Sequence, residues 1–195
     1  MSAPTTEALG APPLSRVALY WGVGGVALLL VQAVIRLTPV AAEPFRRGGL
    51  SALELATYVA WVLVSLYSEG YRGFQKGFVP RVVGRAFFLA RSPRPLFVLL
   101  APAFCMSLVH ARPRRLAVSW TIVLLIAAAV AFVRSLPYPW RGIVDGGVVA
   151  GLAYGLGSLA VTFVRALSGD EPSAELDLPG EDPTRRRGGG EAGAS

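Results

Sequence analysis

The sequence predicts an all-α integral membrane protein: a bundle of four transmembrane helices, a fifth apolar segment that is marginal or re-entrant, and a short interfacial helix. Of its 195 residues 53% are apolar and 16% are charged, less charge than soluble domains of this size carry. A helix needs about 20 apolar residues to cross roughly 30 Å of hydrocarbon. The apolar residues form five blocks: Val17–Ile35, Ala52–Tyr67, Pro95–His110, Leu116–Val133 and Gly142–Val164. The first, fourth and fifth blocks meet or approach the required length, the second does if its helix continues, and the third is marginal.

The charge is unevenly divided along the chain. Residues 1–165 contain sixteen Arg or Lys against five Asp or Glu, whereas residues 166–195 contain three Arg against seven acids. The basic residues lie in short loops beside the apolar blocks, which is typical of topology signals and of contacts with anionic lipid headgroups. We therefore expect a bilayer with anionic headgroups as partner and no nucleic acid. The single cysteine, Cys105, excludes an internal disulfide.

Three regions follow from composition. Residues 1–15 are predicted to be a disordered N-terminus, residues 16–165 the helical transmembrane domain, and residues 166–195 a disordered acidic tail. The first apolar block has a rival interpretation as a signal peptide, because Val40-Ala41-Ala42 resembles a cleavage site. Its apolar run is longer than such peptides carry, so we favour a span. Glycines 22, 24 and 25 would let a neighbouring helix approach it closely.

The second block begins with a capping signal. Ser51 and Glu54 fit a capping box, which we favour for Glu54 over a functional carboxylate inside the membrane. The pattern predicts one helix from Ala52 to Phe78, about 40 Å long and ended by Val79-Pro80, with its charged end in the headgroup region or the water. Arg81–Ala90 is too short and too charged to span, and is predicted to be the interfacial helix.

At 100° per residue, the end of this helix sorts into three lines. These are an aromatic, a glycine and a charged line, formed by Tyr67, Tyr71, Phe74 and Phe78, by Gly70, Gly73 and Gly77, and by Glu69, Arg72 and Lys76. The charged line continues backwards as a polar and aromatic stripe through Ser65, Trp61, Tyr58 and Glu54. A carboxylate at the C-terminal end of a helix opposes the helix dipole. Either the helix runs on past Glu69, or a cation such as Arg72 or one from Arg81–Arg94 holds it; contact with a ligand or partner is the alternative.

The block Pro95–His110 decides the topology. If it spans, there are five crossings and the basic residues divide nine to ten, which selects no orientation. If it dips in and returns, there are four crossings, and fourteen basic residues lie inside against five outside. The positive-inside rule favours the second arrangement, with both termini cytoplasmic. The predicted location is the plasma membrane, the inner membrane of a bacterium.

The last block carries the clearest local signal, three glycines spaced four apart: Gly147, Gly151 and Gly155. Small residues at this spacing let helix backbones pack closely. We favour a partner within the chain over a second copy, because glycine-rich faces are common in polytopic bundles. Asp145 lies in the first turn of this block, where a carboxylate complements the helix dipole and can pair with Arg141; a proton or ion site is the alternative.

No pattern in the chain reaches the specificity of a catalytic, cofactor or metal signature. His110 is the only histidine and has no partner at ligand spacing, so an interfacial position is expected. We predict a non-enzymatic bundle without a cofactor. Its basic cytoplasmic face, with Arg72, Lys76, Arg81 and Arg85, would contact anionic lipid or a membrane protein partner.

The alternative function is a small transporter or channel that works as a homo-oligomer, with Glu69 or Asp145 in the pathway and the glycines at the subunit contact. A membrane enzyme ranks last, because only scattered Glu69, Asp145 and His110 would support it.

Overall fold

The protein is helical throughout the part of the chain that the computed structural model describes, residues 13–174 and 176–178. Its elements are α2 (Pro13–Ala41), α3 (Glu43–Arg47), α4 (Ala52–Ser65), η1 (Leu66–Phe78), α5 (Val79–Arg91), α6 (Pro95–Leu99), α7 (Ala101–Cys105), α8 (Pro113–Arg134) and α9 (Trp140–Leu167). The all-α class is thus confirmed. Three helical stretches are long and apolar enough to cross a membrane: Pro13–Arg47, Pro113–Arg134 and Trp140–Leu167. They indicate a membrane location.

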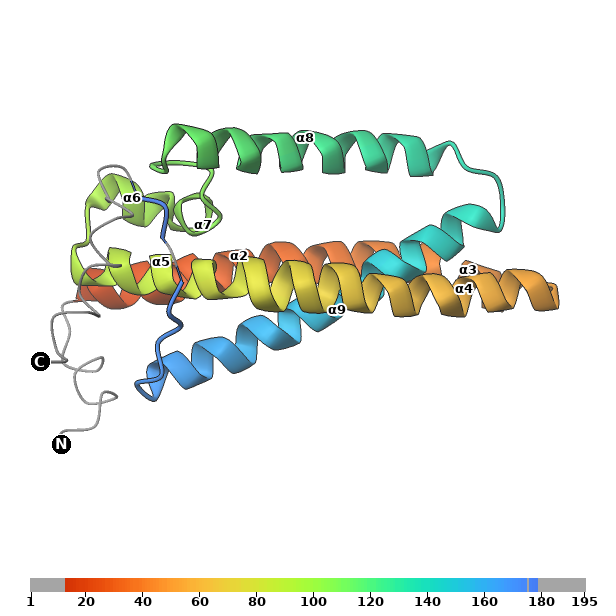
Figure 1. Ribbon diagram of the computed structural model, residues 1–195, viewed down its shortest axis with the longest axis horizontal. Helices are drawn as coiled ribbons and strands as arrows, with labels where there is room; N and C mark the ends of the chain where they lie inside the picture. The colour runs from red at the N-terminus through yellow and green to blue at the C-terminus, as the bar shows by residue number, and fades with distance from the viewer. Residues whose placement is uncertain (1–12, 175, 179–195) are drawn as a thin grey trace, which may run out of the picture.

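The elements α4, η1 and α5 form one uninterrupted helix from Ala52 to Arg91, which we call the rod (Figure 1). Its start is fixed by the predicted capping box: Ser51 Oγ accepts from the backbone N–H of Glu54 at 3.3 Å, and Glu54 Oε2 accepts from the N–H of Ser51 at 2.8 Å. Glu54 therefore has a structural role.

The prediction that Val79-Pro80 ends the helix is wrong. The segment η1 is a π-helix, in which each N–H bonds to the carbonyl five residues earlier, and its last such bond runs from Val79 N–H to Phe74 O. A proline inside an α-helix removes a hydrogen bond and strikes the carbonyl four residues earlier. Pro80 instead stands at the second position of α5, where a new hydrogen-bond register begins and a missing N–H is tolerated.

The predicted interfacial helix is also wrong, because α5 is part of the core. It packs against α2, α7 and α9. The apolar side chains of Val79, Val82, Val83, Ala86 and Leu89 are all buried. The alternation of apolar and basic residues that suggested a membrane surface reflects an apolar face that is covered by protein, and one of the arginines, Arg85, is buried as well.

The segment 95–110 folds back on itself. It forms α6 and α7, five residues each, which is far too short to cross a membrane. It packs on α2 where glycines make room: a Cβ on Gly22 would lie 2.9 Å from Cys105 Sγ, and one on Gly25 would overlap Pro102. Gly24, in contrast, has no such neighbour within 4 Å. The end of α5 and the start of α8 consequently lie at the same end of the bundle (Figure 1).

The helix α8 stands apart from the other long helices (Figure 1). Only 6% of its apolar stretch is buried, compared with 33% for α2 and 22% for α9. Its apolar side chains point in all directions, including Leu124, Leu125 and Phe132. An apolar helix without a polar face is stable only where its surroundings are apolar, so lipid is the medium that suits α8.

The chain continues to pack after α9. Leu176 lies on Gly84 of α5, Leu178 is buried, and the backbone N–H of Arg112 donates to Asp177 O at 2.9 Å. We call residues 168–174 and 176–178 the strap. The sequence predicts disorder from residue 166, whereas α9 runs to Leu167 and the strap returns over α5, because its leucines find the apolar cluster there. The predicted disorder of residues 1–12 and 179–195 lies outside the described residues.

Candidate functional site

The glycine face of α9 packs on the rod of the same chain. A Cβ on Gly147 would lie 2.6 Å from Ser65 Oγ, and one on Gly151 would lie 3.0 Å from Glu69 Oε2. One on Gly155 would lie 2.5 Å from Phe74 Cγ. Real Cβ atoms do not approach other atoms so closely, so the two helices meet at this distance only because the glycines have no side chain.

The rod meets these glycines with the polar and aromatic stripe seen in the sequence. Tyr58 lies against Gly146, and its hydroxyl donates to Ala41 O at 3.2 Å. The indole N–H of Trp61 donates to Val144 O at 3.3 Å. Each polar end thus satisfies a backbone carbonyl, which is what an interface away from water requires.

Glu69 occupies the central position of this interface. It faces Gly151, which lies near the middle of the candidate span α9, and not at its end. The expectation that Glu69 stands in the headgroup region or the water stays a prediction. The sequence offered two structural explanations for Glu69, and the first one holds, because the helix continues past this residue. The second does not, because among the described residues no cation lies within salt-bridge distance of its carboxylate.

The three lines drawn at 100° per residue do not survive in η1. One residue from each line contacts α9. Glu69 contacts Gly151, Gly70 contacts Tyr154, and Phe74 contacts Gly155. The cause is the π-helical hydrogen bonding, which places more residues in each turn and rotates each side chain away from its α-helical position. The hydroxyl of Tyr154 also donates to Gln75 Oε1, across the same interface.

The remaining charged residues of η1 do not enter this interface. Arg72 and Lys76 are exposed, and the Lys76 ammonium lies 4.5 Å from the centre of the Tyr71 ring. Both stand on the part of the rod that leads towards α5.

Asp145 lies near the start of α9. Its side chain is largely buried, and Asp145 Oδ2 lies 3.9 Å from Arg141 Nε, the outer limit of an ion pair. This is the pairing that their spacing suggests. At 100° per residue Asp145 stands well away from Gly151, the residue that Glu69 contacts, so the structure does not bring the two acids together.

Arg85 is not a surface residue. Its side chain is 0% exposed, and its guanidinium donates to the carbonyls of Phe104 at 2.7 Å, Leu176 at 2.6 Å, His110 at 3.0 Å and Val109 at 3.2 Å. It also stacks on the Phe104 ring, with 4.3 Å to the centroid. The prediction that Arg85 contacts lipid is wrong, because this side chain joins the rod to α7, to the following turn and to the strap.

His110 is exposed and lies in the turn before α8. Its ring packs on Phe97, with 4.7 Å between centroids, and its carbonyl accepts from Arg85. The structure does not bring His110 to Glu69 or Asp145. Within the described residues no three His, Cys, Asp or Glu side chains gather in a way that could hold a metal ion.

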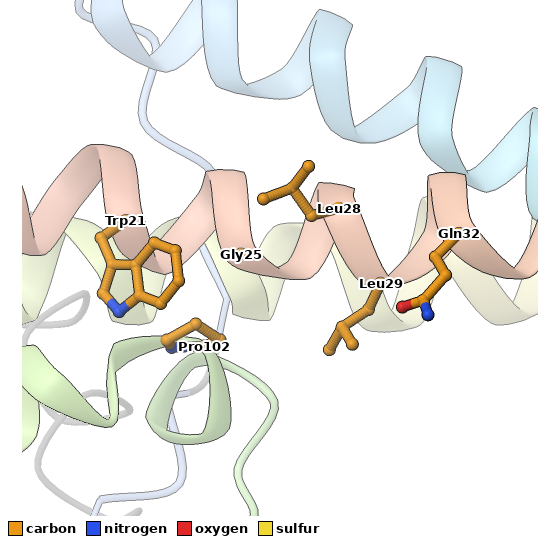
Figure 2. Close-up of a pocket in the computed structure, with 6 residues that line it drawn as sticks. All are labelled: Trp21, Gly25, Leu28, Leu29, Gln32 and Pro102. Carbon is orange, nitrogen blue, oxygen red and sulfur yellow. The ribbon is translucent and has the colours of Figure 1, made fainter.

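Two of the hollows on the surface of the described residues are large enough to compare with the candidate residues. The first, about 270 Å³, is an apolar groove beside α7 that is lined by Trp21, Gly25, Leu28, Leu29, Gln32 and Pro102 (Figure 2). The second, about 400 Å³, is lined by Pro39, Val40, Glu43, Arg46 and Arg47. Neither hollow includes Glu69, Asp145 or His110, so these hollows offer no reaction chamber around the candidate residues.

Sequence reasoning missed the residues of the strap. Glu171 forms an ion pair with Arg91, with 2.6 Å between Oε1 and Nη2, and Asp177 Oδ2 lies 3.6 Å from Arg115 Nε. The available signal was the presence of Leu176 and Leu178 in an otherwise polar, acidic tail, at the point where the basic loops need counter-charges.

Comparison of the chain with protein-family models, curated proteins and solved structures finds no match.

Proposed function

We propose that this protein is a non-enzymatic helical bundle of the plasma membrane of a bacterium, and that its basic end binds anionic lipid headgroups or a protein partner. The supporting observation is the gathering of exposed basic side chains where α5 ends and α8 begins: Arg91, Arg94 and Arg114 are all exposed there. Each Arg near an anionic surface contributes about 1 kcal/mol of attraction.

The proposed topology has four crossings, with the rod as the fourth spanning element and both termini cytoplasmic. In support, α2 begins and α9 ends at the same end of the bundle, and the folded-back segment 95–110 adds no crossing (Figure 1). The opposite end carries the five arginines assigned to the outside: Arg36, Arg46, Arg47, Arg134 and Arg141. A surplus of basic residues at the end with the termini is the arrangement that the positive-inside rule predicts.

Tags test this topology directly. One protease-cleavable tag replaces the loop of residues 135–138 and another follows the C-terminus, in two separate proteins, and cleavage is measured in spheroplasts and in inverted vesicles. We expect the C-terminal tag to be cut only in inverted vesicles and the loop tag only from the outside of spheroplasts. Cleavage of both tags from one side would refute the four-crossing arrangement.

Lipid binding is tested with two matched triple variants. Arg91→Gln/Arg94→Gln/Arg114→Gln removes three exposed charges at the basic end, and Arg36→Gln/Arg46→Gln/Arg47→Gln removes three exposed charges at the other end. Each protein is placed in phosphatidylcholine nanodiscs with a small share of fluorescent phosphatidylglycerol, and energy transfer from tryptophan reports enrichment around the protein. The first triple should lower the enrichment at least tenfold and the second should leave it nearly unchanged. Equal effects of the two triples would contradict the proposal.

The position of Glu69 supports a second candidate, a small oligomeric transporter or channel with Glu69 or Asp145 in the pathway. A carboxylate near the middle of a span is costly, and such residues are commonly retained for ion or proton movement. The glycine face is occupied by the rod, so the subunit contact would have to lie elsewhere. Proton and cation flux into proteoliposomes, compared between the natural chain and Glu69→Gln, tests this; flux that the substitution abolishes would favour transport over the lipid-binding bundle.

A further inference from the structure

Two arginines from different helices meet beside the strap. Arg81 belongs to α5 and lies three residues before Gly84, against which Leu176 of the strap packs. Arg115 belongs to the first turn of α8, and its Nε lies 3.6 Å from Oδ2 of Asp177, the next residue of the strap. The two positive charges therefore lie near the same short segment and repel each other. The one carboxylate within reach of both, among the described residues, is that of Asp177. Among the described residues, the cluster therefore has two positive charges and one negative charge.

Neither arginine uses its full hydrogen-bonding capacity. The Nε–H groups of Arg81 and Arg115 are both buried, and neither has a hydrogen-bond acceptor within the described residues. A buried donor without an acceptor destabilises the folded state, and more so when it is charged. Arg115 Nε lies 3.6 Å from Asp177 Oδ2, well beyond the 2.7–2.9 Å that is typical of a charge-assisted hydrogen bond.

The surroundings add to the positive potential. The first turn of α8 carries no acidic residue, so Arg115 stands at the positive end of the helix dipole, where a cation is unfavourable. A second anion would relieve both this and the repulsion between the guanidinium groups. Arginine presents its donors as a planar fork that matches the oxygens of phosphate.

We propose that Arg81 and Arg115 form a binding site for a phosphate group, and that Asp177 of the strap occupies part of this site when phosphate is absent. This inference rests on the proposed function and names one site within the basic end. The same chemistry has two sources, the phosphodiester of an anionic lipid headgroup and soluble phosphate. Binding of either shifts the carboxylate of Asp177 away and leaves its backbone contact with Arg112 in place.

Nanodiscs that contain the full chain test the site. Phosphatidylglycerol enrichment is measured for the natural protein, for Arg81→Gln/Arg115→Gln, for Asp177→Asn, and for the control Arg46→Gln/Arg47→Gln, which also removes two charges. We expect about a tenfold loss for the first pair, a several-fold gain for Asp177→Asn and little change for the control. Inorganic phosphate is then added as competitor at roughly 1–50 mM, the range in which weak anion sites respond. The ionic strength is kept constant with a salt that contains no sulfate.

Every outcome decides between the possibilities. Competition by inorganic phosphate assigns the site to soluble phosphate, and its absence together with the tenfold loss assigns it to lipid. If Arg81→Gln/Arg115→Gln binds lipid like the natural protein while Arg91→Gln/Arg94→Gln/Arg114→Gln does not, the site is refuted and the proposed function remains. If neither the natural protein nor any variant enriches phosphatidylglycerol, both the phosphate site and the proposed function are refuted. Asp177→Asn guards against misfolding, since a merely damaged protein would not gain affinity.

Discussion

Glu69 lies directly on Gly151, so that its carboxylate oxygen is 3.0 Å from the place where a side chain on Gly151 would begin. The contact joins a polar residue of the rod to the bare backbone of α9. It requires both the missing side chain of Gly151 and the π-helical turn that directs Glu69 towards α9. Because the contact lies near the middle of α9, it governs how closely the two helices approach.

Enlarging Gly151 should separate these helices. Gly151→Leu places a side chain where Glu69 Cβ is 3.2 Å away, so we expect a loss of about 1–3 kcal/mol in stability from overpacking. The measurement is the midpoint of thermal unfolding in mild detergent. The control is Gly157→Leu on the same helix, since no atom lies within 4 Å of the Cβ position there. Equal losses for the two variants would show that helix propensity, and not contact with the rod, sets the effect.

Removing the guanidinium of Arg85 should destabilise the basic end. Arg85→Met keeps most of the apolar length but takes the donors away from buried carbonyls, including those of Phe104 and Leu176, and we expect a loss of about 2–4 kcal/mol. Arg91→Met is the matched control: its pair with Glu171 is exposed, so its loss should be within about 1 kcal/mol. Unfolding in denaturant measures both. A smaller loss for Arg85→Met than for Arg91→Met would contradict the arrangement of the strap.

The thiol of Cys105 should be inert in the folded protein. Burial raises its pKa from 9.0 to about 12, although the nearby charge of Arg85 acts in the opposite direction. At pH 8 the thiolate is then about a thousandfold scarcer than in the unfolded chain, so N-ethylmaleimide should react very slowly until denaturant is added. An exposed Ser168→Cys thiol in a Cys105→Ala chain is the control. Rapid labelling of Cys105 in the folded protein would show that α2 does not cover it.

The same pKa shift has a pH consequence. Between about pH 9 and pH 12 the unfolded chain releases the Cys105 proton whereas the folded chain keeps it, so this group lowers stability as pH rises through that window. Between pH 8 and pH 10 the unfolding midpoint should therefore fall more for the natural chain than for Cys105→Ala. Parallel pH dependence of the two proteins would contradict the burial of the thiol.

Local signals in the sequence were sufficient for several elements. Ser51 and Glu54 show their capping role by spacing alone, because a capping box involves four consecutive residues. The apolar lengths of α8 and α9 are equally local. The stripe through Tyr58, Trp61 and Ser65 could be seen at 100° per residue, since α4 is a regular α-helix up to Ser65.

Other features depend on contacts between distant segments. The π-helical register of η1 has no signature in the order of its residues, and it moves Glu69 and Phe74 onto one face. The burial of Arg85 requires carbonyls that are brought to it by α7 and the strap, and Pro80 is tolerated only because the hydrogen-bond register changes beside it. A single helix examined by itself cannot show which of its faces another segment will cover.

A disulfide between positions 69 and 151 tests most directly whether the rod of the same chain occupies the glycine face of α9. In a Cys105→Ala chain, Glu69→Cys/Gly151→Cys brings together two Cβ positions that are 3.2 Å apart, close to the separation found in disulfides. A protease site in the loop of residues 135–138 then cuts the oxidised protein between the two cysteines. We predict that both fragments remain joined until a reductant is added, and that Glu69→Cys/Gly157→Cys gives separate fragments. Separate fragments from the first pair, or disulfide-linked dimers of the whole chain, would contradict the account.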